Sequence, residues 1–346
     1  MNPAPLRWGV LGTAEIARVA LIPAIRDAGG EVAAVASRDH LRGQRFAACC
    51  GIPKVCESYQ ELVDADLDAV YIPLPNSLHL EWTLRALAAA KHVLCEKPLA
   101  LSPAEAVRMG DAAVAAGVVL GEAVMYRYHP RWEVVRELLG EGRIGALRHI
   151  QGSFTFSLTT SPDIRWQAEL GGGALYDVGS YLVSACRWLA GEPTRVAARA
   201  QLSHGVDAEG SLILEFPGEA EPISAELAYG FRSAEHQQLE LIGTTGSLLI
   251  PKAFSAWRGE AIPLWIQRTP AGPAESIPTP AADPYREMVL AFSQRILGGP
   301  PLAVEPHDSE LGLRVLEAAR RSALSGAFED VSSAADPDLA PGSGDA

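Results

Sequence analysis

The sequence has no excess of basic residues. Its 346 residues include 29 lysines and arginines against 42 aspartates and glutamates, a formal net charge of -13. Such a chain repels the phosphate backbone of a nucleic acid unless a local basic patch offsets the charge, and the sequence shows no such patch. We therefore expect no nucleic-acid partner.

Cysteine is scarce as well, and no C-x-x-C pair occurs. The five cysteines are Cys49, Cys50, Cys56, Cys95 and Cys186. An odd set with this spacing encodes neither a disulfide framework nor a zinc site, so no metal centre is expected. Reduced thiols are typical of the cytosol, and no charged-then-apolar leader precedes the first predicted strand. These features predict a cytoplasmic protein.

The sequence also lacks a run of about 18 apolar residues, which a membrane-spanning helix would need. The nearest stretch, Ala112–Met125, is interrupted by Gly117, Gly121 and Glu122, so no membrane partner is expected. What the chain does have is an ordinary globular composition, with 48% apolar and 21% charged residues. At roughly 150 residues per domain, its length favours two domains.

The first third of the chain alternates strand-like and helix-like segments. Strands are predicted at Arg7–Leu11, Val32–Ser37, Ala69–Pro73, His92–Glu96 and Val118–Glu122. Helices are predicted between them at Ile16–Ala28, His79–Ala90 and Pro103–Ala116. This alternation is typical of parallel strands joined by crossover helices. We therefore predict an α/β domain with a parallel sheet over residues 1–125.

After about Met125 the pattern changes. Helices are predicted at Arg131–Leu139 and Gly179–Leu189, and a strand at Arg148–Phe156. From Arg195 to Pro251 strand-like runs follow one another with hairpin-like separators, which indicates an open antiparallel or mixed sheet. Two late helices, Pro284–Leu297 and Ser309–Leu324, complete a second domain over residues 126–330. Residues 331–346 are rich in small and polar residues and are predicted to be a disordered tail.

A strand-turn-helix segment near the N-terminus favours dinucleotide binding. In such a turn the first glycine permits the bend, the second lets the backbone approach a pyrophosphate, and the third position must be small. Here those positions are Gly12, Ala14 and Ala17, and we assign Thr13 and Ile16 to the cofactor as well. Because two of the three glycines are replaced, a purely structural turn is the alternative.

The end of the second predicted strand favours NADP over NAD. An acidic residue there would bind the ribose hydroxyls of NAD, whereas serine with arginine accommodates a 2′-phosphate. The chain reads Ser37-Arg38-Asp39, and Arg42 lies within one helical turn. Two alternatives stay open, namely that Asp39 binds a ribose and that Arg38 is only a solvated surface charge.

Two further segments follow strand ends, where open α/β sheets bind ligands. They are Pro75–His79 and Glu96–Pro98. Asn76 as a helix cap and His79 as a surface histidine are the structural alternatives. A purely structural role is harder to assign to Lys97, which is fixed between an acid and a proline. A lysine without a partner beside the expected nicotinamide would carry a large desolvation cost.

These segments, with the Gly12 turn and the stretch Gly171–Tyr181, resemble the Gfo/Idh/MocA oxidoreductases over nearly the whole chain. The resemblance implies an N-terminal Rossmann domain with a doubly wound sheet and a C-terminal α+β domain on an open, mostly antiparallel sheet. It also implies self-association through that sheet, as a homodimer or homotetramer, a nicotinamide cofactor between the domains, and a cis bond before Pro98. The cofactor-binding residues it implies are Gly12, Thr13, Ala14, Ile16, Ser37, Arg38, Pro75, Asn76, His79, Glu96 and Lys97.

The position of Tyr181 distinguishes branches of this family. Many members carry histidine there and aspartate three residues later, where this chain has Ser184. Tyrosine, together with the run Met125–Pro130, is similar to the branch of glucose-fructose oxidoreductase, xylose dehydrogenase, dihydrodiol dehydrogenase and nucleotide-sugar ketoreductases. We therefore predict an NADP-dependent oxidoreductase acting on a sugar, nucleotide sugar or diol. A cofactor-binding regulator without turnover and an NAD-retaining glycosidase are the alternatives.

Tyr181 is the predicted acid/base. A phenol of pKa ~10 needs about 4 kcal/mol to titrate near pH 7, and a lysine ammonium ~4 Å away supplies about that much at an effective dielectric of ~20. Lys97 would fill that role while Tyr181 exchanges the proton of the substrate hydroxyl and hydride passes to or from the nicotinamide. Asp177 would orient the sugar or Lys97. A core position for Tyr181 is the structural alternative.

Three further residues are predicted to contact substrate: Arg165, Trp166 and Tyr126. Arg165 could bind a hydroxyl or a phosphate, or it could pair with Asp163. Packing at the domain junction would explain Tyr126 equally well.

Overall fold

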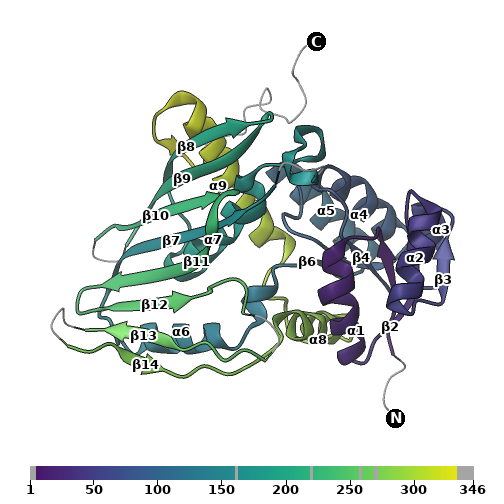
Figure 1. Cartoon of the computed structure of the whole chain (residues 1–346), viewed down its shortest axis with the longest axis horizontal. Coiled ribbons are helices and arrows are strands. Elements are labelled where there is room, and N and C mark those ends of the chain that lie inside the picture. The colour runs from purple at the N-terminus through teal and green to yellow at the C-terminus, as the bar shows by residue number, and fades with distance from the viewer. Residues whose placement is uncertain (1–4, 160–162, 219–220, 257–258, 269–271, 333–346) are drawn as a thin grey trace. The chain divides into compact units, whose positions relative to one another are not determined.

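The chain forms two compact units in a computed structural model (Figure 1). The structure describes residues 5–159, 163–218, 221–256, 259–268 and 272–332. Unit 1 comprises Met1–Tyr128 and Asp283–Glu310, and unit 2 comprises His129–Ala282 and Leu311–Ala346. From residue 333 on, the predicted disordered tail lies outside the described residues.

Within its described residues, unit 1 contains a six-stranded parallel sheet in the order β3-β2-β1-β4-β5-β6. The strands are β1 (Arg7–Leu11), β2 (Glu31–Ala36), β3 (Lys54–Cys56), β4 (Ala69–Ile72), β5 (His92–Cys95) and β6 (Leu120–Glu122). The chain order reverses between β1 and β4, the place where doubly wound sheets bind ligands at the carboxyl ends of their strands. The predicted Rossmann arrangement is confirmed.

Helices cover both faces of this sheet. They are α1 (Ile22–Asp27), α2 (His40–Cys50), α3 (Tyr59–Asp64), α4 (His79–Ala88), α5 (Pro103–Ala116), α8 (Pro284–Ile296) and the start of α9 (Pro306–Ser325). The first predicted helix is divided, because a π-helical turn, Ala17–Leu21, precedes α1. The sequence did not indicate α2, β3 or α3, since a three-residue strand and a six-residue helix are too short for a clear period.

The return of residues 283–310 to unit 1 differs from the predicted domain limits, which put all of 126–330 in one domain. In the structure α8 packs on α1, and the Phe292 ring lies 5.4 Å from the Trp8 ring. A Cβ on Gly121 would lie only 2.9 Å from the Leu302 side chain, so this segment is closely packed on β6 as well. The helical period of α8 shows that one face is apolar, but it does not show which sheet that face covers.

Unit 2 is built on a nine-stranded sheet among the described residues, in the order β14-β13-β12-β11-β7-β10-β9-β8-β15 (Figure 1). The strands are β7 (Leu147–Ser157), β8 (Arg195–Ser203), β9 (Val206–Phe216), β10 (Ile223–Gly230), β11 (Arg232–Gly243), β12 (Ser247–Pro251), β13 (Leu264–Gln267), β14 (Glu275–Ile277) and β15 (Glu329–Asp330). Of the strand pairs that the described residues form in this sheet, only β7 and β10 are parallel. The predicted open, mostly antiparallel sheet is confirmed.

Among the helices of unit 2, α7 (Ser180–Ala190) packs against β7 and β10 of this sheet. The helix α6 (Arg131–Gly140) contacts β12 where Arg131 donates to the Pro251 carbonyl at 3.0 Å, and α9 contacts β8 where the Ser322 hydroxyl accepts the N–H of Ala198 at 2.8 Å. On β9, Leu212 and Leu214 point to the buried face, whereas Ser211 and Ile213 are exposed. Alternate residues therefore face solvent, as expected for a sheet covered on one side. No helix in the described part of the chain combines the length and the apolarity that crossing a membrane requires.

Candidate active site

The turn after β1 has the geometry that a dinucleotide needs. Gly12 has a positive φ of 104°, and a Cβ there would lie 3.0 Å from the Leu74 side chain. Its N–H donates to the carbonyl of Ala36 at 2.8 Å, which joins the turn to β2. The buried Ala17 at the third position allows the helix to pack closely on the sheet. Partly exposed residues at this edge are Thr13, Ala14, Ile16, Pro75 and Asn76.

Beside that turn, the end of β2 presents the two predicted arginines. Ser37 is buried and its Oγ accepts the N–H of Asp39 at 3.3 Å. Asp39 caps α2 by accepting the N–H of Arg42 at 3.0 Å, so its carboxylate is engaged in the helix start. Arg38 and Arg42 are exposed, and Arg42 Nη2 donates to the Thr13 carbonyl at 3.3 Å. This arrangement suits an anion better than a ribose hydroxyl pair.

Tyr59 is a neighbour of Arg38 that the sequence pattern did not indicate. Burial raises the pKa of Tyr59, and the positive charges of Arg38 and Arg42 oppose that rise. The Tyr59 ring meets the Trp82 ring edge-on at 5.0 Å. No local motif could have found this residue, because it lies on a different element, α3.

His79 joins two of the predicted loops from inside the unit. The side chain is fully buried, with Nδ1 2.8 Å from the Pro98 carbonyl and Nε2 2.9 Å from the Leu74 carbonyl. Burial lowers the pKa of His79, while the two carbonyl acceptors favour the protonated ring. The imidazole therefore positions the loops that follow β4 and β5 and has no surface with which to contact a nucleotide.

Lys97 lies two residues after the end of β5, at the carboxyl edge of the sheet. The Lys97–Pro98 bond is cis, which confirms that expectation. Glu96 accepts a hydrogen bond from the buried Tyr71 hydroxyl at 2.5 Å, and its other oxygen accepts the N–H of Lys97 at 3.3 Å. Burial and the adjacent Glu96 charge raise the pKa of Tyr71 well above its ordinary value, so the phenol is the donor. Glu96 is thus held in place between β4 and the lysine.

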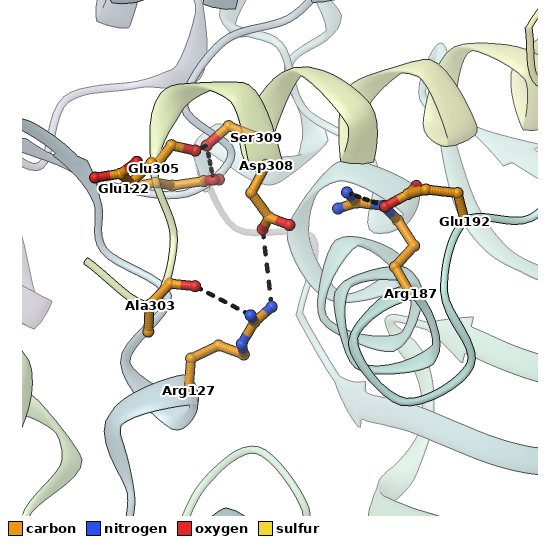
Figure 2. Close-up of polar contacts among 8 residues, drawn as sticks. All are labelled: Glu122, Arg127, Arg187, Glu192, Ala303, Glu305, Asp308 and Ser309. Carbon is orange, nitrogen blue, oxygen red and sulfur yellow. Dashed lines mark hydrogen bonds and ion pairs between the residues drawn. The ribbon is translucent and has the colours of Figure 1, made fainter. Parts of the chain in front are cut away.

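The same loop is held from its other side by Glu122, at the end of β6 (Figure 2). Glu122 is buried, and its Oε1 accepts the N–H of Leu99 at 2.9 Å. Its Oε2 accepts the Ser309 hydroxyl at 2.6 Å. The first turn of α9 therefore contacts the carboxylate that fixes the backbone just beyond Pro98.

Arg127 makes a second contact with the returning segment of unit 1 (Figure 2). Its Nη2 donates to the Ala303 carbonyl at 3.0 Å, and its Nη1 lies 3.8 Å from the Asp308 carboxylate. The Arg127 guanidinium therefore connects the last residues before the chain enters unit 2 with residues 283–310, which belong to unit 1 again.

In unit 2, Arg165 forms a double ion pair. Its Nη1 lies 3.1 Å from the Asp163 carboxylate and its Nε lies 2.9 Å from the Asp177 carboxylate. Its guanidinium also lies over the Phe156 ring, at 5.8 Å. Burial disfavours the charged form, but the two carboxylates outweigh this effect, and the pKa of Arg165 is raised. The pairing with Asp163 is confirmed, and the pairing with Asp177 is new.

Trp166 belongs to an aromatic cluster next to this ion pair. Its ring meets the His204 ring at 5.5 Å and the Phe231 ring at 5.6 Å, both edge-on. Its indole N–H donates to the Thr159 carbonyl at 3.2 Å. The side chain is partly exposed, so it can still contact a ligand.

The triple glycine lets the chain pass closely between Arg165 and a strand. A Cβ on Gly172 would lie 2.5 Å from the Arg165 carbonyl oxygen, and a Cβ on Gly173 would lie 2.2 Å from Asp207 Oδ1. Gly171 and Gly173 also have positive φ angles of 74° and 112°. Any side chain at these positions would displace the segment that follows.

That segment is a π-helical turn, Leu175–Gly179, which continues into α7. It carries Asp177 and Tyr181, which are four residues apart and so lie on one side of the helix. The Tyr181 ring lies 5.4 Å from the Phe154 ring and 5.5 Å from the Phe254 ring, and the residue is 8% exposed. Because the Phe154 and Phe254 rings also stack on each other at 5.4 Å, the three rings form one cluster that holds Tyr181, with a small part of its surface accessible.

The other end of α7 is closed by the buried Arg187 (Figure 2). Its Nε and Nη2 bind the two oxygens of Glu192 at 2.7 and 2.8 Å. This bidentate pair fixes the helix that carries Tyr181 at its C-terminal end.

Tyr126 lies in a different environment from the one predicted. It belongs to unit 1 and is only 2% exposed, which agrees with the packing alternative better than with a substrate contact. Its position in an aromatic run could not reveal this, because aromatic residues serve cores and clefts alike. Among the described residues, no group of three histidine, cysteine or acidic side chains is arranged to hold a metal ion.

Two family models match the chain. One, described as oxidoreductase family with an NAD-binding Rossmann fold, matches residues 6–124. The other, the GFO/IDH/MocA C-terminal domain, matches residues 132–249. The first match includes the Gly12 turn and Lys97, and the second includes Tyr181.

Named relatives include a reductase and a dehydrogenase. The dTDP-3,4-didehydro-2,6-dideoxy-alpha-D-glucose 3-reductase of Saccharopolyspora spinosa is 39% identical over 300 residues, which cover 85% of this chain and 89% of the relative. The D-xylose 1-dehydrogenase (NADP(+)) 2 of Haloferax volcanii is 38% identical over 327 residues, which cover 93% of this chain and 98% of the relative.

A crystal structure of a 3-ketoreductase from Actinomadura kijaniata, in complex with NADP and TDP-benzene, is similar over most of its length. The TM-score is 0.87 at 35% identity, covering 92% of this chain and 98% of that chain. The same enzyme has been solved with a tyrosine replaced by phenylalanine and with a lysine replaced by alanine. These two residues lie as far apart in its sequence as Lys97 and Tyr181 lie in this one.

Proposed function

This chain belongs to the Gfo/Idh/MocA family of oxidoreductases, and we propose that it transfers a hydride between NADP and a carbon of a sugar or nucleotide sugar. One observation carries the proposal. Lys97 stands at the carboxyl edge of the parallel sheet that also forms the Gly12 turn, in a chain whose second unit holds Tyr181 and Asp177 on one helical segment. The spacing of the lysine and the tyrosine matches that of the two residues replaced in the related 3-ketoreductase, which supports the assignment.

Unit 1 supplies the residues that would hold the cofactor. The close approach at Gly12 fits a pyrophosphate, and the exposed Arg38 next to Ser37 fits a 2′-phosphate. The NADP bound in the related 3-ketoreductase and the NADP in the name of the related xylose dehydrogenase support this choice. His79 and Glu96 act by positioning the loops around Asn76 and Lys97.

Unit 2 supplies the proton chemistry. When bound, a nicotinamide cofactor donates or accepts the hydride. Tyr181 gives its phenolic proton to the substrate oxygen in reduction and takes that proton back in oxidation. The ammonium of Lys97 stabilises the phenolate form, and Asp177, oriented by Arg165, binds a substrate hydroxyl. Trp166 and Arg165 contribute to the substrate surface.

A substrate panel tests this function. Aldoses, keto-sugars, nucleotide sugars and diols are assayed with NADP(H) and with NAD(H), following the absorbance of the reduced nicotinamide. Turnover of a sugar with NADP(H) is the expected result. Binding of cofactor without turnover of any member would instead indicate a regulator, and glycoside hydrolysis without a net absorbance change would indicate an NAD-retaining glycosidase.

Arg38→Ala should weaken NADP binding by roughly 1.5–3 kcal/mol, the range for hydrogen bonds to charged groups, and leave NAD binding nearly unchanged. The reason is that only NADP carries the 2′-phosphate that the guanidinium would bind. Isothermal titration of the two oxidised cofactors measures both affinities. Arg108→Ala, which removes another exposed arginine of unit 1, from α5, is the matched control and should change neither. Equal losses for both cofactors would refute the assignment.

Self-association through the exposed face of the unit 2 sheet is a further part of the proposal. This face includes Ile213 and Trp265, which are 42% and 38% exposed. Single exposed apolar side chains are ordinary on a protein surface, so this part of the proposal rests mainly on the family resemblance and on the open sheet face. Light scattering should therefore give a multiple of the 36.7 kDa chain mass, and Ile213→Arg should shift the population toward monomer. A wild-type chain that is wholly monomeric at micromolar concentration would contradict this.

We also propose a cytoplasmic location. All five cysteines are free thiols, and four of them are buried. Such a set is compatible with a reducing compartment and offers no disulfide that an oxidising one would preserve.

A further inference from the structure

Asp207, near the start of β9, contacts the segment that carries the proposed acid/base. Its Oδ2 accepts the N–H of Leu175 at 2.6 Å, and it also accepts the N–H of Ala174. Leu175 is the first residue of the π-helical turn that leads into α7. The carboxylate therefore satisfies the first amides of the segment that bears Asp177 and, one turn later, Tyr181.

The glycine-rich approach to this segment is shaped by the same carboxylate. A side chain at Gly173 would be strained at its φ of 112°, and its Cβ, 2.2 Å from Asp207 Oδ1, would push this carboxylate away from the segment. The positive φ of Gly173, 112°, places the next two amides toward the acid. The third glycine is thus explained by a protein contact, and needs no ligand to account for it.

A second contact joins the same hairpin to the other side of Asp177. The turn between β8 and β9 contains His204, whose ring meets Trp166 at 5.5 Å. Trp166 is adjacent to Arg165, which pairs with the Asp177 carboxylate at 2.9 Å. The β8–β9 hairpin therefore supports both the backbone and the side-chain partner of the segment.

We propose that Asp207 is a positioning residue for the reaction: as a carboxylate it fixes the first turn of the segment, and so sets the place of the Tyr181 hydroxyl. This role rests on the proposed function of Tyr181. An ionised carboxylate accepts both amides, whereas a protonated one turns one oxygen into a donor and loses part of that hold.

The environment makes this hold sensitive to pH. Burial raises the pKa of Asp207 to about 6, while its amide hydrogen bonds and the Arg320 guanidinium oppose the rise. The other groups that face it are Tyr176 and Tyr229, and Glu317 acts on Tyr176 from α9. Protonation of Asp207 near pH 6 would therefore weaken its hydrogen bonds to the two amides. Of the groups named here, only Arg320 carries a positive charge that favours the ionised carboxylate.

The sign of the effect on folding is opposite to the effect on activity. The pKa of Asp207 in the folded chain lies above the ordinary value of 3.8, so the folded chain binds the proton more tightly than the unfolded chain does. Acidification from about pH 6 to pH 4 therefore favours folding through this group while it removes the ionised acceptor. A loss of activity near pH 6 that arises from Asp207 is thus not accompanied by unfolding.

The test measures kcat against pH in the reduction direction, with the substrate found in the panel and NADPH. Tyr181 must be protonated in this direction, so its own titration gives no loss of activity on the acid side. The wild type should show an acid limb near pH 6 with an unchanged near-ultraviolet circular dichroism spectrum. Asp207→Asn should lower kcat by about 10- to 100-fold, the scale of a misplaced catalytic group, abolish that limb and leave KM for NADPH unchanged.

The control is Glu209→Gln, which removes a carboxylate from the same strand and should leave kcat and the acid limb as in the wild type. If Tyr181→Phe lowers kcat but Asp207→Asn changes neither kcat nor the pH profile, the positioning role is overturned while the proposed function stands. If Asp207→Asn does not fold, the wild-type profile decides alone, since a flat response from about pH 5 to pH 7 excludes the role. An active Tyr181→Phe enzyme overturns the proposed function itself.

Discussion

Tyr181→Phe should lower kcat by about 10²- to 10⁴-fold and leave cofactor affinity close to wild type. The phenylalanine ring can occupy the same space beside the stacked Phe154 and Phe254 rings, so the substitution removes the hydroxyl and keeps the packing. Steady-state kinetics give kcat, and titration of NADP gives the affinity. Tyr128→Phe is the control for the loss of a phenol, because it removes a hydroxyl from a unit 1 residue that takes no part in the proposed chemistry.

Near-normal turnover of the Tyr181→Phe enzyme, with an unchanged pH profile, would contradict the mechanism. The proton transfer would then have to come from another group. Asp177 would be the first to examine, because it shares the helical segment with Tyr181. His79 is no longer a candidate, since both of its ring nitrogens face backbone carbonyls in the interior.

Lys97→Met should also lower kcat by about 10²- to 10⁴-fold, because the positive charge that stabilises the phenolate is lost while the length of the side chain is kept. In the oxidation direction, the rising limb of the pH profile should move to higher pH. The double variant with Tyr181→Phe should be little worse than either single variant, since groups that act as a unit are not additive.

Lys54→Met is the control for the loss of a lysine, because Lys54 pairs with Glu61 on the surface of unit 1. It should leave kcat within about twofold, as is usual for an exposed ion pair. Additive losses in the double variant, or an unmoved pH limb in Lys97→Met, would show that Lys97 and Tyr181 do not act together.

In unit 1, the sequence predicted the ends of strands correctly where an apolar run stops close to a glycine or a proline. The turn at Gly12 and the strand before Lys97 could be placed this way. The sequence could not predict the unit to which α8 belongs. The helical period of α8 shows that one face is apolar, but it does not show which sheet that face packs against. The partner of that face, Trp8, is almost the whole chain away.

The same limit applied to the candidate site. His79 had the residue type and the position of a cofactor ligand, but its two carbonyl partners bury it. Arg165 could be paired with Asp163 from adjacency, whereas its pair with Asp177 depends on a loop closed by glycines. Asp207 had no local signal at all, because an isolated acid on a strand acquires its role only when Gly173 is folded against it.

The return of residues 283–310 to unit 1 has a consequence for synthesis on the ribosome. The nascent N-terminal unit cannot be completed when residue 128 emerges, because Trp8 and Gly121 still lack Phe292 and Leu302. At about 5–20 residues per second, the wait until residue 310 is roughly 10–40 s. For that time the cell holds an apolar surface that only the later part of the same chain can cover. A fragment ending at residue 128 would expose it permanently.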